Sequence, residues 1–101
     1  MEEGREAVRN TIELVGQVAD LFYRQQDKDG YFKLNELIGQ ISNAMEYVLG
    51  NGQNEVSEEC SGIIEYLNEA LGAMEARDTI LLADLLQYEI KDRFQKLYEM
   101  M

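Results

Sequence analysis

The chain has 101 residues, of which 46% are hydrophobic and 29% are charged, enough for one domain with a single core and too few for two. Nine lysines and arginines stand against 20 aspartates and glutamates, giving a net charge of −11, so the average field repels nucleic-acid phosphates and anionic lipid headgroups. Histidine is absent, which excludes imidazole bases, Ser-His or Cys-His nucleophile pairs and His-containing zinc sites. We therefore expect a protein that is not an enzyme, needs no cofactor and binds neither nucleic acid nor membrane.

The cysteine content and the N-terminal residues indicate a reducing compartment. A single cysteine, Cys60, cannot form an intramolecular disulfide, which excludes a secreted disulfide scaffold. Residues 1–6 are acidic where a signal peptide is basic and then apolar, and the apolar runs are far shorter than a membrane span. We expect a cytoplasmic protein in which Cys60 is a small buried side chain rather than a reactive thiol.

Apolar residues recur at intervals of three and four along nearly the whole chain, and there is no proline to break a helix. This periodicity predicts four helices, over about 2–25, 29–49, 55–76 and 79–100. Each would be roughly 30 Å long, and the short links between them force neighbouring helices to run antiparallel. We expect residues 1–101 to form a single all-α domain, an antiparallel up-down four-helix bundle.

The helices should end at recognisable signals and bury one stripe each. Residues 50–52, Gly-Asn-Gly, predict a left-handed helix end followed by a turn, Asn54 is a candidate cap for the third helix, and Asp78 or Thr79 for the fourth. The predicted buried stripe of the first helix is Val8, Ile12, Val15, Ala19 and Phe22, and that of the second is Leu34, Ile38, Ile41, Met45 and Val48. The predicted stripe of the third helix is Val56, Cys60, Ile63, Leu67, Leu71 and Met74, and that of the fourth is Leu82, Leu86, Ile90, Leu97 and Met101.

Three glycines, Gly16, Gly39 and Gly62, lie 23 residues apart inside predicted helices. A glycine in a helix interior costs about 1 kcal/mol relative to alanine, so each needs a packing reason. The midpoints between them fall at the links, which places all three at one level of the bundle. We expect close helix contacts at that level; a duplicated helical hairpin is the alternative explanation of the spacing.

Residues 25–36, between the first two helices, resemble the twelve-residue calcium loop of EF-hand proteins. The resemblance implies that Asp27 and Asp29 supply single oxygens, Tyr31 a carbonyl oxygen and Glu36 a bidentate carboxylate. The match departs from the EF-hand pattern, because glutamine replaces the opening aspartate and the chain has no second such loop. The alternative to a calcium-responsive switch is that Asp27 or Asp29 caps the second helix.

Charged and aromatic residues outside the stripes suggest interaction surfaces. From Leu34 to Ala76 the chain has eight glutamates and no lysine or arginine, which predicts either a solvated face or a docking surface for a basic partner. Glu89 and Arg93 are one helical turn apart and can pair with each other, as a structural pair or across an interface.

Four tyrosines are the remaining candidates. Tyr47, Tyr66 and Tyr98 lie beside the apolar stripes, so they either widen an apolar face beyond what a monomer covers or form an ordinary monomer surface. Together with Tyr88 they are the predicted anchors for a partner.

The run LLADLLQYEI at 81–90, with LNELI at 34–38, is similar to small acidic helical proteins of flagellated Gram-positive bacteria that lack an established function. In size, acidity and helical character the chain is also similar to flagellar and type III export chaperones, which shield a helix of their cargo. These resemblances imply a protein-interaction module, an adaptor or export chaperone. We expect a homodimer in which a groove between helices accepts an amphipathic partner helix.

Overall fold

The structure, a computed structural model, describes residues 2–50 and 54–100. The first three helices are α1 (Glu2–Tyr23), α2 (Asp27–Leu49) and α3 (Asn54–Glu75). The last helical stretch has three consecutive parts, α4 (Thr79–Asp84), the π-helical turn η1 (Leu85–Ile90) and α5 (Lys91–Met100). The described residues contain no strand, so the all-α prediction is confirmed.

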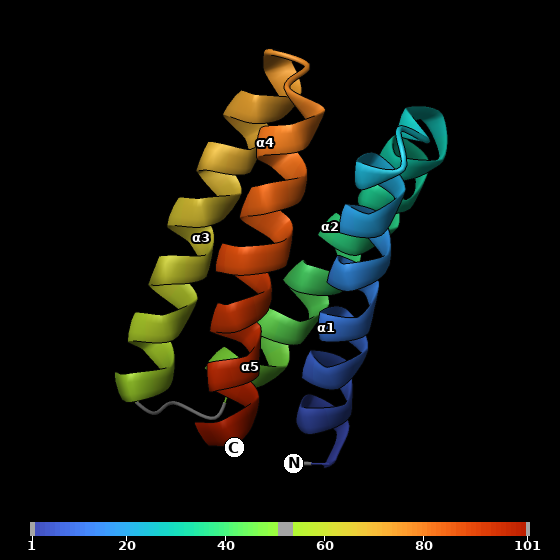
Figure 1. The fold of residues 1–101 in the computed structure, drawn as a ribbon. Coiled ribbons are helices and arrows are strands. Elements are labelled where there is room, and N and C mark those ends of the chain that lie inside the picture. Colours follow the sequence, from blue (N-terminus) through green and yellow to red (C-terminus); the bar gives the residue numbers. More distant parts are fainter. Residues whose placement is uncertain (1, 51–53, 101) are drawn as a thin grey trace.

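The helices follow one another with reversals of direction (Figure 1). The chain rises through α1, descends through α2, rises through α3 and descends through α4, η1 and α5. The helix bounds predicted from periodicity differ from the observed ones by two residues or fewer. The division of the last helix by a π-helical turn was not predicted.

The two links 24–26 and 76–78 share one backbone course. The middle residue of each has a left-handed backbone, with φ of 62° at Gln25 and 56° at Arg77. The amide of the next residue, Gln26 or Asp78, donates a 2.9 Å hydrogen bond to a carbonyl five residues earlier. This pattern closes a helix end and normally uses glycine at the left-handed position. The chain therefore makes both hairpin turns with side chains that the backbone conformation disfavours.

The caps follow the predictions only in part. The carboxylate of Asp78 accepts a 3.1 Å hydrogen bond from the amide of Leu81, which confirms the predicted cap of α4. The side chain of Gln26, the residue before α2, does not cap the helix. Asp27 and Asp29 lie inside the first turn of α2, where their negative charges interact favourably with the helix dipole. The prediction that one of them caps α2 is therefore wrong.

The end of α2 also differs from the prediction. Gly50 has a right-handed backbone, with φ of −62° and ψ of −18°, so it is not the left-handed residue predicted for this end. The remaining residues of the turn predicted at 50–52 and the side chain of Asn54 lie outside the described residues.

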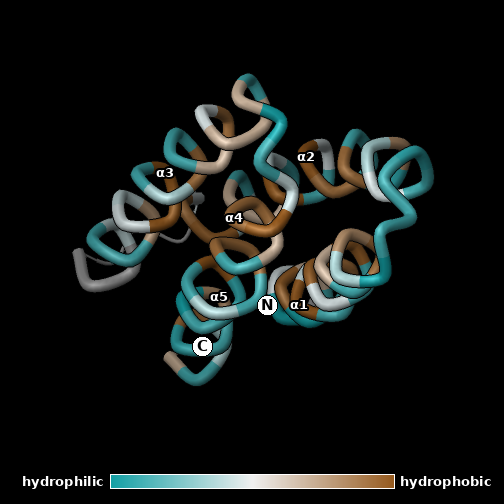
Figure 2. Tube along the Cα trace, turned by 45° about the horizontal axis from the view of Figure 1, so that its top comes forward, coloured by the Kyte–Doolittle hydropathy of each residue, from teal (hydrophilic) through white to brown (hydrophobic). Residues whose placement is uncertain are grey.

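Buried side chains from all the helices form one core. Figure 2 shows the hydrophobic segments of the helices turned towards the interior. The ring of Phe22 is fully buried and packs edge-to-face on Tyr31, with 5.0 Å between ring centroids. Cys60 is buried as predicted, and burial, followed by the charge of Glu59, raises the pKa of its thiol. The largest fully buried side chains are Phe22, Leu37, Ile63, Leu82, Leu86, Ile90, Phe94 and Leu97.

The helices do not pack equally closely around this core. α1 packs along α2 on one side and along α4, η1 and α5 on the other, while α3 packs on the same last stretch. By contrast, α2 and α3 approach each other at few places. The core is therefore closed on three sides and open along the seam between α2 and α3.

The π-helical turn matches the spacing of the buried residues around it. Leu82, Leu86, Ile90 and Phe94 are all buried and follow one another at intervals of four. At 3.6 residues per turn such a row drifts around an α-helix, whereas the wider turn of a π-helix keeps it facing one way. Phe94, which the sequence analysis did not assign to the core, is fully buried for this reason.

The glycines do not provide the predicted close helix contacts. A Cβ on Gly39 would meet nothing within 4 Å, so no helix approaches there and the prediction is wrong at this position. A Cβ on Gly62 would come within 2.9 Å of the Arg93 guanidinium, and one on Gly16 within 3.4 Å of the Lys91 amine. Where these glycines make room, they do so for long cationic side chains and not for a neighbouring backbone.

Candidate functional site

The open seam between α2 and α3 contains an apolar groove. It consists of two cavities of about 120 Å³ and 390 Å³, which share Ile38, Ile41 and Leu67 and are therefore continuous. The smaller cavity is lined by Leu34, Leu37, Ile38, Ile41, Leu67, Ala70, Leu71, Met74, Leu82 and Leu86, and the larger by Ile38, Ile41, Ser42, Met45, Glu46, Leu49, Ile64 and Leu67.

Large aliphatic side chains form the two rims of this groove. Ile38 and Leu49 on α2 and Ile64 and Leu71 on α3 are between 40% and 48% exposed. Periodicity predicted that Ile38 and Leu71 belong to buried stripes, and this prediction is wrong for both residues. They are half-exposed because α2 and α3 stand apart at the seam, so neither helix covers the other's inner edge.

The floor of the groove belongs to the last helical stretch. Leu82 of α4 and Leu86 of η1 line it and are themselves buried. Because these two residues also pack in the core, the floor is held by the fold and does not depend on what lies in the groove. The groove is thus a preformed apolar surface with four adaptable aliphatic side chains along its edges.

The charge around the groove has one sign. Glu46 lines the larger cavity, and Glu75 lies one helical turn after the rim residue Leu71 on α3. The described residues that line the groove include no lysine or arginine, in keeping with the sequence between residues 34 and 76, in which every charged residue is a glutamate. The charged residues named beside this apolar groove are therefore all negative.

The four tyrosines predicted as anchors do not gather at this groove. The Arg93 guanidinium lies over the Tyr66 ring, 5.5 Å from its centroid, and Arg5 lies 4.7 Å from the ring of Tyr98. Tyr88 of η1 is 65% exposed beside α1, and Tyr47 is exposed on α2. The structure distributes these side chains over separate surfaces, and none of them lines either cavity of the groove.

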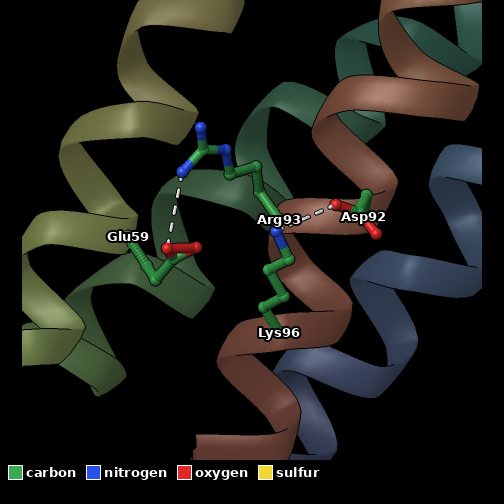
Figure 3. Close-up of polar contacts among 4 residues, drawn as sticks. All are labelled: Glu59, Asp92, Arg93 and Lys96. Carbon is green, nitrogen blue, oxygen red and sulfur yellow. Dashed lines mark hydrogen bonds and ion pairs between the residues drawn. The ribbon is translucent and has the colours of Figure 1, made fainter.

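The predicted pairing of Glu89 with Arg93 is wrong. The Arg93 guanidinium reaches from α5 to α3, where its Nη1 lies 3.4 Å from Oε2 of Glu59 (Figure 3). The hydrogen bond with Tyr66 raises the pKa of Arg93 most, and the charge of Glu59 raises it further. Because Glu89 lies in the π-helical turn, the one-turn spacing of a regular α-helix does not apply between these residues. Arg93 therefore links two helices.

A separate polar cleft of about 600 Å³ lies between α1 and η1. The Tyr23 hydroxyl donates a hydrogen bond to Asp84 there, and burial, followed by this bond, raises the pKa of Tyr23. Glu13, Asp20 and Lys91 also line the cleft. No nucleophile with an orienting base is among its lining residues, and Tyr23, which the sequence analysis did not single out, joins α1 to α4.

The twelve-residue calcium loop suggested at 25–36 is not formed. α2 begins at Asp27, so Asp27, Asp29, Tyr31 and Glu36 all lie within its first three turns. Successive side chains of a helix point in different directions, and these ligand groups do not surround one point as an EF-hand loop requires. Within residues 2–50 and 54–100, no group of three or more acidic, Cys or His side chains could hold a metal ion.

Comparison with known proteins gives a family. A family model described as "Domain of unknown function (DUF8042)" matches residues 1–100. The chain belongs to the DUF8042 family. No curated protein and no solved structure matches this DUF8042 chain. None of its described helices is long and apolar enough to cross a membrane.

Two rim residues of this DUF8042 domain, Ile64 and Leu49, were not predicted from the sequence. Ile64 directly follows the stripe residue Ile63, and Leu49 directly follows Val48. A second large aliphatic residue next to a stripe widens the apolar face of a helix, and this doubling was the available signal. It occurs on both α2 and α3, the two helices that face each other across the groove.

Proposed function

We propose that this DUF8042 protein is a non-enzymatic protein-interaction module that binds a helix of a partner. In this proposal the chain is an antiparallel up-down four-helix bundle with one open seam, and the partner helix completes the seam between α2 and α3. The supporting observation is the continuous apolar groove flanked by four half-exposed aliphatic residues. An adaptor or an export chaperone is the concrete form of this role.

Burial of the rim provides a useful but limited driving force. Complete burial of an aliphatic side chain contributes about 1.5–3 kcal/mol, so covering the exposed half of four such residues contributes about 3–5 kcal/mol. Association costs at least about 4 kcal/mol in lost rigid-body freedom. The partner must therefore bury an apolar stripe of its own, as an amphipathic helix does. The balance favours a reversible complex over a permanent one.

The proposal is tested with two isoleucines that differ mainly in position. Ile64 lies on the groove rim, whereas Ile80 on α4 is exposed to a similar extent, 48% against 50%, and does not line the groove. Tagged wild type, Ile64→Asp and Ile80→Asp are used to capture proteins from a lysate of the source organism, with calcium and with chelator. A helical partner retained by wild type and Ile80→Asp but lost with Ile64→Asp supports the proposal.

The same experiment has outcomes that contradict it. Equal capture by both variants would place the interaction elsewhere on the surface. Capture that requires calcium would favour the switch suggested by residues 25–36. The homodimer expected from the sequence is checked by light scattering of the three proteins, because a dimer that only Ile64→Asp dissociates would make a second copy the occupant of the groove.

A further inference from the structure

We infer that the groove takes an amphipathic helix of about 15 residues that carries lysine or arginine on both sides of its apolar stripe. This inference rests on the function proposed above and names the chemistry of its partner. Groove length, groove lining and charge each define one property of the occupant.

The length of the groove defines the length of the helix. Along α2 the lining extends from Leu34 in the smaller cavity to Leu49 in the larger. At 1.5 Å per residue, these 15 steps span about 22 Å. A partner helix that lies along the whole groove therefore needs about 15 residues, or four turns.

The lining defines the central face of that helix. Every residue of the smaller cavity is apolar, and the larger one adds only Ser42 and Glu46 as polar members. A charged group placed in the middle of the groove would lose its hydration without gaining a partner, which is unfavourable. The occupant must therefore present an uninterrupted stripe of aliphatic or aromatic side chains at spacings of three and four.

The charges at the rim define the flanks. Glu46 lines the groove on the α2 side, and Glu75 follows the rim residue Leu71 of α3 by one helical turn, so each of the two rim helices carries a carboxylate within one turn of a rim residue. Lys33 of α2 pairs with Glu36, and Arg93 of α5 pairs with Glu59. A helix with basic residues beside its stripe would place opposite charges along both rims.

The same charges argue against a second copy of the chain. Each chain has a net charge of −11, and a symmetric pair would bring together two seams that are lined by Glu46 and contain no lysine or arginine among their lining residues. Like charges that face each other across an interface weaken association. The basic helix of a different protein is therefore favoured over self-association.

Three synthetic peptides test the inference with the full-length protein. All have about 16 residues. The first two share one helical leucine stripe, with lysine at the flanking positions of the first and glutamate at those of the second. The third has the composition of the first in a scrambled order that removes the stripe. Binding is followed by fluorescence anisotropy of the labelled peptides. We expect the lysine peptide to bind at least about tenfold more tightly than the glutamate peptide and to lose affinity as salt is raised. The scrambled peptide, which keeps the charge, should not bind.

Substitutions in the protein locate the site. Ile64→Asp should abolish binding of the lysine peptide, while the matched Ile80→Asp should leave it unchanged. Glu46→Gln should weaken binding by about twofold to fivefold, the range for one exposed ion pair, and Glu13→Gln on α1 should have no effect.

The outcomes separate this inference from the proposed function. If both stripe peptides bind equally and Ile64→Asp abolishes both, the groove binds helices but the requirement for basic flanks is wrong. If the scrambled lysine peptide binds as well as the first, simple charge attraction explains the result and the inference is wrong. If no peptide binds at millimolar concentration, both the inference and the helix-binding groove are rejected.

Discussion

Gly39 offers a direct test of the packing described above. It lies in the interior of α2, is exposed, and has open space where a Cβ would be. Alanine is favoured over glycine in a helix interior by about 1 kcal/mol, and nothing in the surroundings opposes the added methyl group. Gly39→Ala should therefore stabilise the domain by about that amount, which raises the melting temperature of a chain of this size by about 4 °C.

Gly30, on the same helix, provides the opposite case. A Cβ at Gly30 would lie 2.8–3.0 Å from three atoms of the Phe22 ring. That ring is fully buried and packs on Tyr31, so it cannot move aside cheaply. Overpacking of this kind costs roughly 1–3 kcal/mol, which exceeds the gain in helix propensity. Gly30→Ala should lower the melting temperature.

Thermal and urea unfolding of wild type and both variants, followed by circular dichroism at the helix band, checks the pair. The two variants carry the same substitution on one helix, so a difference in sign can come only from their surroundings. A lower melting temperature for Gly39→Ala would refute the reasoning, because it would mean that another helix or another molecule covers this face of α2. Such a result would restore the close contact predicted from the glycine spacing.

Three further predictions concern polar groups. Because the pKa of Tyr23 is raised in the folded state, its contribution to stability is complete below the ordinary tyrosine value of 10.0 and is lost as the pH rises above it. Tyr23→Phe should therefore lose less stability than wild type at alkaline pH, as measured by urea unfolding. At neutral pH the same substitution should cost about 1 kcal/mol through loss of the hydrogen bond to Asp84. Arg93→Ala should destabilise the domain by more than Glu59→Gln, since removing the arginine leaves the largely buried Glu59 carboxylate without its cation. Chemical denaturation of both variants measures the two losses, and the reverse order would contradict this role of Arg93. Millimolar calcium should leave the melting temperature unchanged, because residues 25–36 form a link and a helix instead of a binding loop. A melting temperature that rises when calcium is added and falls again with chelator would contradict this prediction.

The links between helices show where sequence reasoning was incomplete. The signal for a left-handed helix end is normally glycine. The run Gly-Asn-Gly at 50–52 carries this signal, yet the backbone of Gly50 is right-handed. The left-handed residues are instead Gln25 and Arg77, which carry no such signal. Their conformation is imposed by the close packing of two helices across a three-residue link, an effect that operates through the tertiary structure.

The ion pairs show a similar limit. Spacing along one helix suggested that Arg93 pairs with Glu89, yet its partner is Glu59, 34 positions earlier in the chain. A spacing rule considers only neighbours on the same helix and assumes regular α-helical turns. The π-helical turn and the neighbouring α3 both lie outside that assumption.

The sequence by itself determined the helical class, the approximate bounds of the helices, the burial of Cys60 and the anionic character of α2 and α3, because each follows from local periodicity or composition. It could not determine which apolar residues are covered. Ile38 and Ile41 are equivalent members of one stripe in the sequence, but one is half-exposed on the groove rim and the other is buried. That difference depends on how far α2 stands from α3. The distance between two helices is decided by the packing of the whole core against α1 and the last helical stretch, so only the tertiary structure reveals the groove.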